Sequence, residues 1–129
     1  MKIAVVGSRE FGNMKFAEKM IMHIFTKEMD YRSDTPILIS GGARGIDKLA
    51  EKVVNDINTH MAYSYKIDKV IFQADWDKYG KSAGFIRNKL IIDEADFVLA
   101  FWDGESKGTW HSIDLARKAG KSINIYVRK

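Results

Sequence analysis

One short stretch, PILISGGARGIDKLA at residues 36–50, constrains the fold of this chain most strongly. It begins with an apolar run at residues 37–39, which has the length and residue types of a fully buried strand. Gly41 and Gly42 interrupt the run, and apolar residues then recur at helical spacing between Ile46 and Ile57. The pattern therefore predicts a strand, a tight glycine turn and a helix.

A turn of this kind can bind phosphate. Glycines let a ligand approach the backbone closely, and the start of the following helix presents unpaired N–H groups and a partial positive charge. Arg44 adds a full positive charge beside Ser40 and the two glycines. The alternative is a tight turn without a ligand, with Arg44 as a solvated surface residue, and a glycine pair alone does not separate the two.

Strand and helix patterns alternate about five times along the chain, with glycine-containing turns after the first, second and fourth strands. This alternation predicts an α/β fold, namely a single Rossmann-like, doubly wound, mainly parallel sheet of about five strands with helices on both faces. We expect one domain over residues 1–129. In the strand order 3-2-1-4-5 the three glycine turns converge on one crevice, which makes that crevice the predicted site.

The helices are predicted from caps and apolar spacing. Asn13 is expected to cap a helix that runs to about residue 30, and Ser82 a helix whose buried stripe contains Phe85, Ile86, Leu90 and Ile91. Arg87 and Asn88 then lie on a different face of that helix.

Two segments are less regular. Residues 74–81 are predicted to form an irregular loop, and their Trp, Tyr and Lys side chains make the loop a candidate site. Lys81 is expected to face solvent unless this loop folds over the site. The segment that carries His60, Tyr63 and Tyr65 is either a loop or a short extra element.

Composition narrows the class of partner. The formal charge of +4 and the pI of 9.2 favour an anionic ligand, but the lysines form no stripe or block. We therefore expect a nucleotide-sized ligand and do not expect nucleic acid. The chain has no cysteine, no apolar run long enough to span a membrane and no room for a signal peptide, so a cytoplasmic protein without a membrane partner is expected.

No metal site or cofactor is expected. Asp93, Glu94 and Asp96 have no histidine near them, so a solvated acidic turn is favoured over a metal site or a catalytic acid pair. Asp47 falls in the first turn of its helix, where a carboxylate complements the helix dipole, and this role is preferred to catalysis.

Four blocks, GSREF, ISGGARGID, ADWDKYGKSAGFIRN and ADFVLAFWDGESKGT, occur in this order over most of the chain. Together they resemble the SLOG superfamily of Rossmann-like nucleotide-binding proteins, specifically its small YspA-like and YpsA-like members. The wider superfamily includes the phosphoribohydrolases of the "lonely guy" type, the DNA-uptake protein DprA and sensor domains that bind ADP-ribose-like signals. The resemblance also implies a homo-oligomer.

The resemblance assigns roles to individual residues. It implies that one phosphate turn contains Gly41, Gly42 and Gly45, and that a second contains Gly104, Gly108 and Thr109. It further implies that Arg87 matches the arginine that helps phosphoribohydrolases to cleave an N-glycosidic bond.

One position departs from the enzymes of the superfamily. They carry a glutamate three residues after the threonine, where this chain has Ser112. A serine cannot stabilise an oxocarbenium-like centre or prepare a water as a carboxylate does. Glu105, His111 and Asp114 are the possible substitutes, and whether the chain is an enzyme stays open.

Three functions follow from these observations. The leading one is binding of a nucleotide, an ADP-ribose-type ligand or a cyclic nucleotide by a sensor or sequestering protein. The alternatives are an N-glycoside hydrolase acting on a nucleoside monophosphate or NAD-like substrate, with Arg87 as its catalytic residue, and a DprA-like single-stranded nucleic-acid binder. Trp102 is expected either to stack on the ligand or to cover the sheet edge. The predicted ligand-binding residues are Gly7, Ser8, Arg9, Ser40, Gly41, Gly42, Arg44, Gly45, Trp76, Arg87, Asn88, Trp102, Gly104, Ser106, Gly108 and Thr109.

Overall fold

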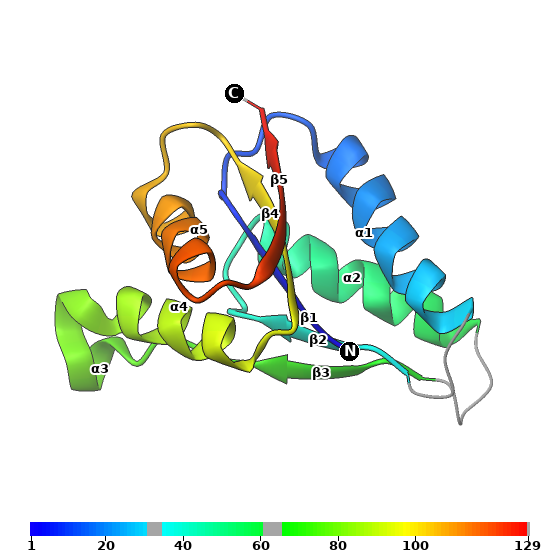
Figure 1. The fold of residues 1–129 in the computed structure, drawn as a ribbon, viewed down its shortest axis with the longest axis horizontal. Coiled ribbons are helices and arrows are strands. Elements are labelled where there is room, and N and C mark those ends of the chain that lie inside the picture. Colours follow the sequence, from blue (N-terminus) through cyan, green and yellow to red (C-terminus); the bar gives the residue numbers. More distant parts are fainter. Residues whose placement is uncertain (31–34, 61–65, 129) are drawn as a thin grey trace.

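A computed structural model of the chain describes residues 1–30, 35–60 and 66–128. Within these residues five parallel strands form one sheet in the order β3-β2-β1-β4-β5 (Figure 1). The predicted strand order and the predicted fold class are confirmed. The strands are β1 (Lys2–Gly7), β2 (Ile37–Ser40), β3 (Asp68–Ile71), β4 (Phe97–Trp102) and β5 (Ser122–Val127).

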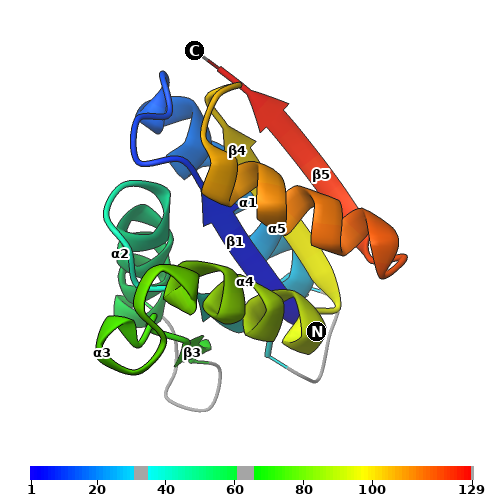
Figure 2. The same ribbon diagram turned by 90° about the vertical axis from the view of Figure 1, so that its left-hand side faces the viewer.

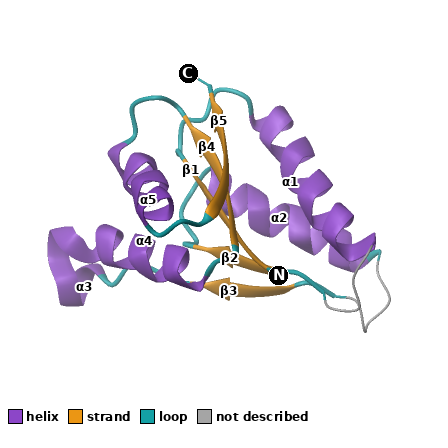
Figure 3. Cartoon of the chain, in the orientation of Figure 1, coloured by secondary structure: helices purple, strands orange, loops and turns teal. Residues whose placement is uncertain are grey.

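Helices cover both faces of this sheet. On one face lie α1 (Met14–Asp30) and α2 (Ile46–Thr59), and on the other lie α4 (Ala83–Glu94) and α5 (Lys107–Lys118). Figure 3 shows the strands between these two helical layers, and Figure 2 shows α4 and α5 together in front of the sheet. None of the helices in the described part of the chain is long and apolar enough to cross a membrane.

The apolar runs of the central strands exist because both of their faces are buried. Alternate side chains of β1 point to opposite faces, so Ile3 and Val5 pack against α1 and α2 while Ala4 and Val6 pack against α4 and α5. The side chains of β4 alternate between the two faces in the same way. Two separate apolar cores therefore hold the same central strands in place.

The register of β1 and β4 determines where the crevice forms. Val5 lies opposite Leu99 and Gly7 lies opposite Phe101, so the two strands end at the same level. The backbone N–H of Ser8 extends the pairing by donating to the carbonyl of Phe101 at 2.9 Å. The turns that follow β1 and β4 consequently lie beside each other.

The predicted cap of α1 is confirmed, because the Asn13 side-chain oxygen accepts a hydrogen bond from the backbone N–H of Phe16 at 3.0 Å. The irregular loop predicted before α4 is wrong. That segment contains a short helix, α3 (Trp76–Tyr79), followed by a 3-10 turn, η2 (Gly80–Ser82). Asp75 closes the helical turn by accepting from the backbone N–H of Lys78 at 3.1 Å, although no residue of α3 is buried.

The orientation of α4 also differs from the prediction. Its buried side chains are Ala83, Asn88, Ile91 and Ile92, whereas Phe85 and Leu90 are about half exposed. Ser82 precedes the helix without a side-chain cap hydrogen bond. The inner face of α4 carries Arg87 and Asn88 where it borders the cavity, and Ile91 and Ile92 where it packs against the apolar core. Tyr63 and Tyr65 lie outside the described residues.

Candidate functional site

Two glycines bring the turn after β1 against the turn between β2 and α2. A Cβ atom on Gly7 would lie 2.6 Å from the Cβ of Ile46, a fully buried side chain. Gly45 has a φ of +79°, and a Cβ there would lie 2.8 Å from the Cα of Arg9. Both approaches exclude any larger residue, so these glycines determine how closely the two turns pack.

The turn after β1 also contacts the loop that leads from β4 to α5. The buried Ser8 hydroxyl accepts from the backbone N–H of Asp103 at 3.1 Å and lies 3.3 Å from the hydroxyl of Thr109. Ser8 and Thr109 come from turns that are about a hundred residues apart in the sequence. The hydroxyl pair therefore fixes the first turn of α5 beside the end of β1.

The first turn of α5 is organised by Asp103 and Ser106. One carboxylate oxygen of Asp103 accepts from the backbone N–H groups of Glu105 at 2.9 Å and Ser106 at 2.7 Å. These hydrogen bonds, foremost that from Ser106, lower the pKa of Asp103. Ser106 is the N-cap of α5, and its side chain accepts from the N–H of Thr109. A Cβ on Gly108 would meet no atom within 4 Å, so a ligand can approach the backbone there.

Two adjacent residues of α4 connect the turn after β2 to the start of α5. Arg87 donates from Nη1 to the carbonyl of Gly41 and from Nε to the side-chain oxygen of Asn88, both at 3.1 Å. The Asn88 amide lies 3.2 Å from both the Gly108 carbonyl and His111 Nδ1. Burial is the main cause of the lowered pKa of His111, which favours the neutral ring that can accept this hydrogen bond.

These turns and α4 enclose a cavity of about 420 Å³. Its lining includes residues from β1, α2, α3, α4 and the first turn of α5, so the crevice predicted from the strand order is present. The predicted site residues that line it are Gly7, Arg9, Trp76, Arg87, Asn88, Ser106, Gly108 and Thr109.

The other predicted site residues lie around the cavity rather than in its described lining. Ser8 and Gly41 support it through the hydrogen bonds given above, and Gly45 through its contact with Arg9. Trp102 donates its indole N–H to the Ser106 carbonyl at 3.0 Å, and its ring lies 5.4 Å from that of Trp110, so it covers the sheet. The residues of this group are Ser8, Ser40, Gly41, Gly42, Arg44, Gly45, Trp102 and Gly104.

Several lining residues were not predicted. Lys81 lines the cavity while remaining exposed, because α3 and η2 bring it to the cavity mouth. Phe85 lines it because α4 is rotated away from the expected orientation, and no sequence signal indicated that rotation. Asp103 follows Trp102 directly at the end of β4, so its place after a buried strand could have identified it.

Asp47 is the most informative of the unpredicted residues. It is 8% exposed, lines the cavity and accepts from the backbone N–H of Ala43 at 3.1 Å. Burial raises its pKa from 3.8 to about 6, while the Ala43 N–H and the charge of Arg87 act in the opposite direction. A Cβ on Gly41 would lie 2.6 Å from Arg87 Nη1 and 3.0 Å from the Asp47 carboxylate, so a larger residue there would displace the ends of these two side chains.

The carboxylates that line the cavity are not the ones named from the sequence as possible substitutes for the glutamate absent at Ser112. Ser112 lines the cavity, whereas Glu105, His111 and Asp114 are not among its described lining residues. Asp47 supplies a carboxylate from the opposite side, at the start of α2. The lining of the cavity thus combines the acidic side chains of Glu10, Asp47 and Asp103 with the cationic side chains of Arg9, Lys81 and Arg87.

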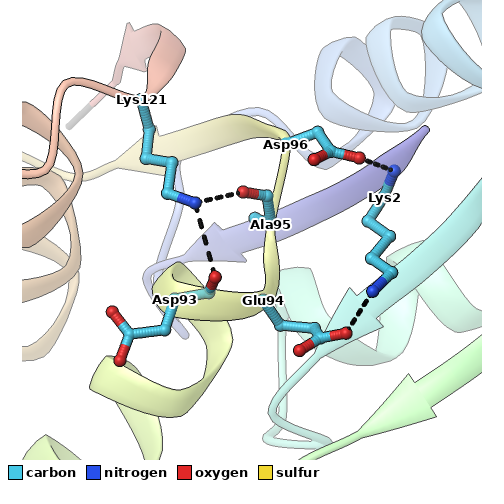
Figure 4. Close-up of polar contacts among 6 residues, drawn as sticks. All are labelled: Lys2, Asp93, Glu94, Ala95, Asp96 and Lys121. Atoms are coloured by element: carbon cyan, nitrogen blue, oxygen red, sulfur yellow. Dashed lines mark hydrogen bonds and ion pairs between the residues drawn. The ribbon is translucent and has the colours of Figure 1, made fainter.

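The acidic residues near the end of α4 lie at the opposite end of the sheet from the cavity. The Glu94 carboxylate pairs with the Lys2 side chain, and the Asp96 carboxylate accepts from the Lys2 backbone N–H at 2.8 Å (Figure 4). Lys121 donates to the carbonyls of Asp93 and Ala95. Within the described residues, no cluster of histidine and acidic side chains is placed to hold a metal ion.

Comparison with known proteins gives a relative in sequence and several in structure. No family profile matches the chain. The "Gene 61 protein" of Mycobacterium phage D29 is 35% identical over 85 residues, which cover 65% of this chain and 66% of the phage protein. The match therefore spans just under two thirds of the length of that relative.

Three solved structures share the fold of almost the whole chain. DNA processing protein A from Streptococcus pneumoniae has a TM-score of 0.69 at 18% identity and is matched over 49% of its length by 96% of this chain. The molybdenum cofactor binding protein of Rippkaea orientalis has a TM-score of 0.66 at 19% identity, with 99% of this chain covering 77% of it. DNA processing protein A from Helicobacter pylori has a TM-score of 0.62 at 19% identity, with 97% of this chain covering 64% of it.

One expectation is corrected by these structures. We did not expect a nucleic-acid partner because the lysines form no stripe, yet the Helicobacter structure is described by its single-stranded DNA binding mode. A spread of basic residues along the sequence is therefore no argument against nucleic acid, because the fold and not the order of the chain decides which charges lie together. The comparisons establish that this chain has the Rossmann-like fold of DNA processing protein A and of the molybdenum cofactor binding protein.

Proposed function

We propose that the chain binds a nucleotide or a nucleotide-derived signal through its phosphate group, as a small sensor or sequestering protein of the SLOG superfamily. The observation that carries this proposal is the convergence of Arg9, Lys81 and Arg87 with the start of α5 on one cavity. Cationic side chains and a helix N-terminus both favour an anion, and Gly108 leaves the backbone open to it.

The size and lining of the cavity fit a small molecule. Its volume of about 420 Å³ lies within the roughly 300–1,000 Å³ that is usual for ligand pockets. Apolar side chains such as Val6 and Ile91 line it together with the polar groups. A nucleotide offers the same combination, with a charged phosphate, polar sugar hydroxyls and an apolar base.

Arg9 gives the sharpest test, with Arg44 as a matched control. Both are exposed arginines in glycine turns, but only Arg9 belongs to the described lining of the cavity. Calorimetry at high micromolar protein with AMP, ADP-ribose, NAD and cyclic nucleotides should detect a ligand. Arg9→Ala should then weaken binding about tenfold, because a charge-assisted hydrogen bond contributes roughly 1.5 kcal/mol or more, while Arg44→Ala should leave it unchanged.

Two results of that experiment would contradict the proposal. The first is the absence of binding heat across the whole panel. The second is an equal loss of affinity in Arg9→Ala and Arg44→Ala, which would point to diffuse charge attraction in place of the cavity. Single-stranded DNA belongs in the same panel because of the DNA processing proteins, and its binding should weaken steeply with salt if the phosphate backbone is recognised.

An N-glycoside hydrolase is the second candidate, and Asp47 is the observation that favours it. The carboxylate lines the same cavity as Arg87, so an acidic group is available to stabilise positive charge on a ribose or to prepare a water. Release of free base from a nucleoside monophosphate or NAD that is lost in both Asp47→Asn and Arg87→Ala would support this activity. Substrate that stays intact through prolonged incubation would exclude it.

A further inference from the structure

Two exposed aromatic side chains form one wall of the cavity. We call Trp76 and Phe85 the aromatic wall; their residues are 57% and 51% exposed, and both line the cavity. They come from different helices, α3 and α4, that are separated along the chain by η2. A Cβ on Gly84 would lie 3.4 Å from the Trp76 ring, an ordinary contact distance, so the indole lies against the start of α4.

The two apolar cores do not account for the aromatic wall. Neither Trp76 nor Phe85 belongs to either cluster of packed core residues, and no residue of α3 is buried. Large aromatic side chains that are left in solvent and line the same cavity indicate a binding site more than a folding role. Leu90, also on α4 and 48% exposed, is not among the described residues of the cavity.

The aromatic wall is held in a defined relation to the anion-binding part of the cavity. The Phe85 ring lies 4.4 Å from the His111 ring at an interplanar angle of 44°. His111 Nδ1 lies within hydrogen-bond distance of Asn88, whose side-chain oxygen accepts from Arg87. Asn88 therefore contacts both His111, which packs against the Phe85 ring, and Arg87, which lines the cavity.

We propose that the aromatic wall of Trp76 and Phe85 is a nucleobase subsite, so that the ligand is a base-bearing nucleotide and not a sugar phosphate alone. This inference rests on the proposed function, because it takes the phosphate to be bound by the cationic part of the same cavity. The planar face of a base stacks on aromatic rings whatever the base, so the wall supplies affinity for nucleotides in general.

The experiment compares ligands with and without a base. AMP, GMP, CMP, UMP and ribose 5-phosphate are titrated calorimetrically into the wild-type chain, Phe85→Ala and Leu90→Ala. A stacked base gives about 5- to 150-fold in affinity, so at least one nucleotide should bind more tightly than ribose 5-phosphate by such a factor. Phe85→Ala should remove most of that difference and leave ribose 5-phosphate binding unchanged, whereas Leu90→Ala should change neither.

A second pair of variants, at Trp76, separates the loss of the aromatic face from a folding defect. Trp76→Phe keeps an aromatic face and should retain most of the preference for the nucleotide, while Trp76→Ala should lose it. Circular dichroism establishes that both variants are folded.

The inference is overturned if ribose 5-phosphate binds as tightly as every nucleotide, or if Phe85→Ala behaves like Leu90→Ala. In either case phosphate binding, and with it the proposed function, still stands. If none of these probes binds to the wild-type chain, the inference is overturned, and the titrations with ADP-ribose, NAD and cyclic nucleotides then decide the proposed function separately.

Discussion

Replacing Asp47 by asparagine should stabilise the protein at neutral pH, because the wild-type carboxylate is buried. Burial raises the pKa of Asp47 from 3.8 to about 6, and the nearby charge of Glu51 raises it further. The Ala43 N–H, the Arg87 charge and the Gly41 N–H lower it by less than burial raises it. The folded state therefore holds the Asp47 proton more tightly than the unfolded state does.

The sign and size of the effect follow from this difference. A group whose pKa is higher in the folded state contributes most stability below its unfolded pKa, and that contribution is lost as the pH rises through about 6. A difference of about 2 pH units corresponds to roughly 3 kcal/mol, of which about 2 to 3 kcal/mol is lost between pH 4 and pH 7.5. Asparagine is uncharged and keeps an oxygen that can accept from the Ala43 N–H.

Urea unfolding of wild type and Asp47→Asn at pH 4 and pH 7.5 measures this contribution directly. The two proteins share all other titrating groups, so the change in their difference between the two pH values isolates Asp47. The variant should gain about 2 to 3 kcal/mol relative to wild type on going from pH 4 to pH 7.5. A difference that does not change with pH, or a variant that becomes relatively less stable at pH 7.5, would refute the reasoning.

Three further substitutions test the packing and the site separately. Gly45→Ala should lower the free energy of unfolding by roughly 1–3 kcal/mol in a urea titration, because Gly45 has a positive φ and a Cβ there would collide with the Arg9 backbone. An unchanged urea midpoint would contradict this. Gly108→Ala should leave thermal stability unchanged or slightly raised, since its Cβ meets no atom, but should weaken nucleotide binding in calorimetry by occupying the space beside the phosphate. Lys121→Ala should cost about 1 kcal/mol of stability through the lost hydrogen bonds to the carbonyls of Asp93 and Ala95 at the end of α4, and an effect on ligand affinity would contradict its place at the far end of the sheet (Figure 4).

Much of the fold was predictable because its signals are local. The apolar runs of the central strands are continuous since both faces of a parallel sheet are covered, and the glycine turns mark where those strands end. The alternation of strand and helix then leaves few possible topologies, and the order 3-2-1-4-5 is confirmed. The helix cap at Asn13 could also be predicted, because its hydrogen bond joins residues only three positions apart.

The errors arose where a helix faces something other than the apolar core. On α4 the sequence indicated that Phe85 is buried and Asn88 is not, but the structure reverses this. The first half of α4 borders the cavity, and its inward face there carries Arg87 and Asn88. The short helix α3 escaped prediction because a single turn capped by Asp75 leaves no apolar periodicity.

The α/β class, the strand order and the end of the sheet at which the cavity lies could all be predicted from the residues, because the strand, turn and helix patterns that indicate them are local. The polar groups that share the cavity could not, because the packing of distant segments brings them together. That Arg9 lines it while Arg44 is not among its described lining, and that Asp47 lines it while Glu105 and Asp114 are not among that lining, depends on the packing of Gly7 against Ile46 and on the rotation of α4. These are contacts between segments far apart in the sequence, and no local pattern encodes the direction in which a side chain then points.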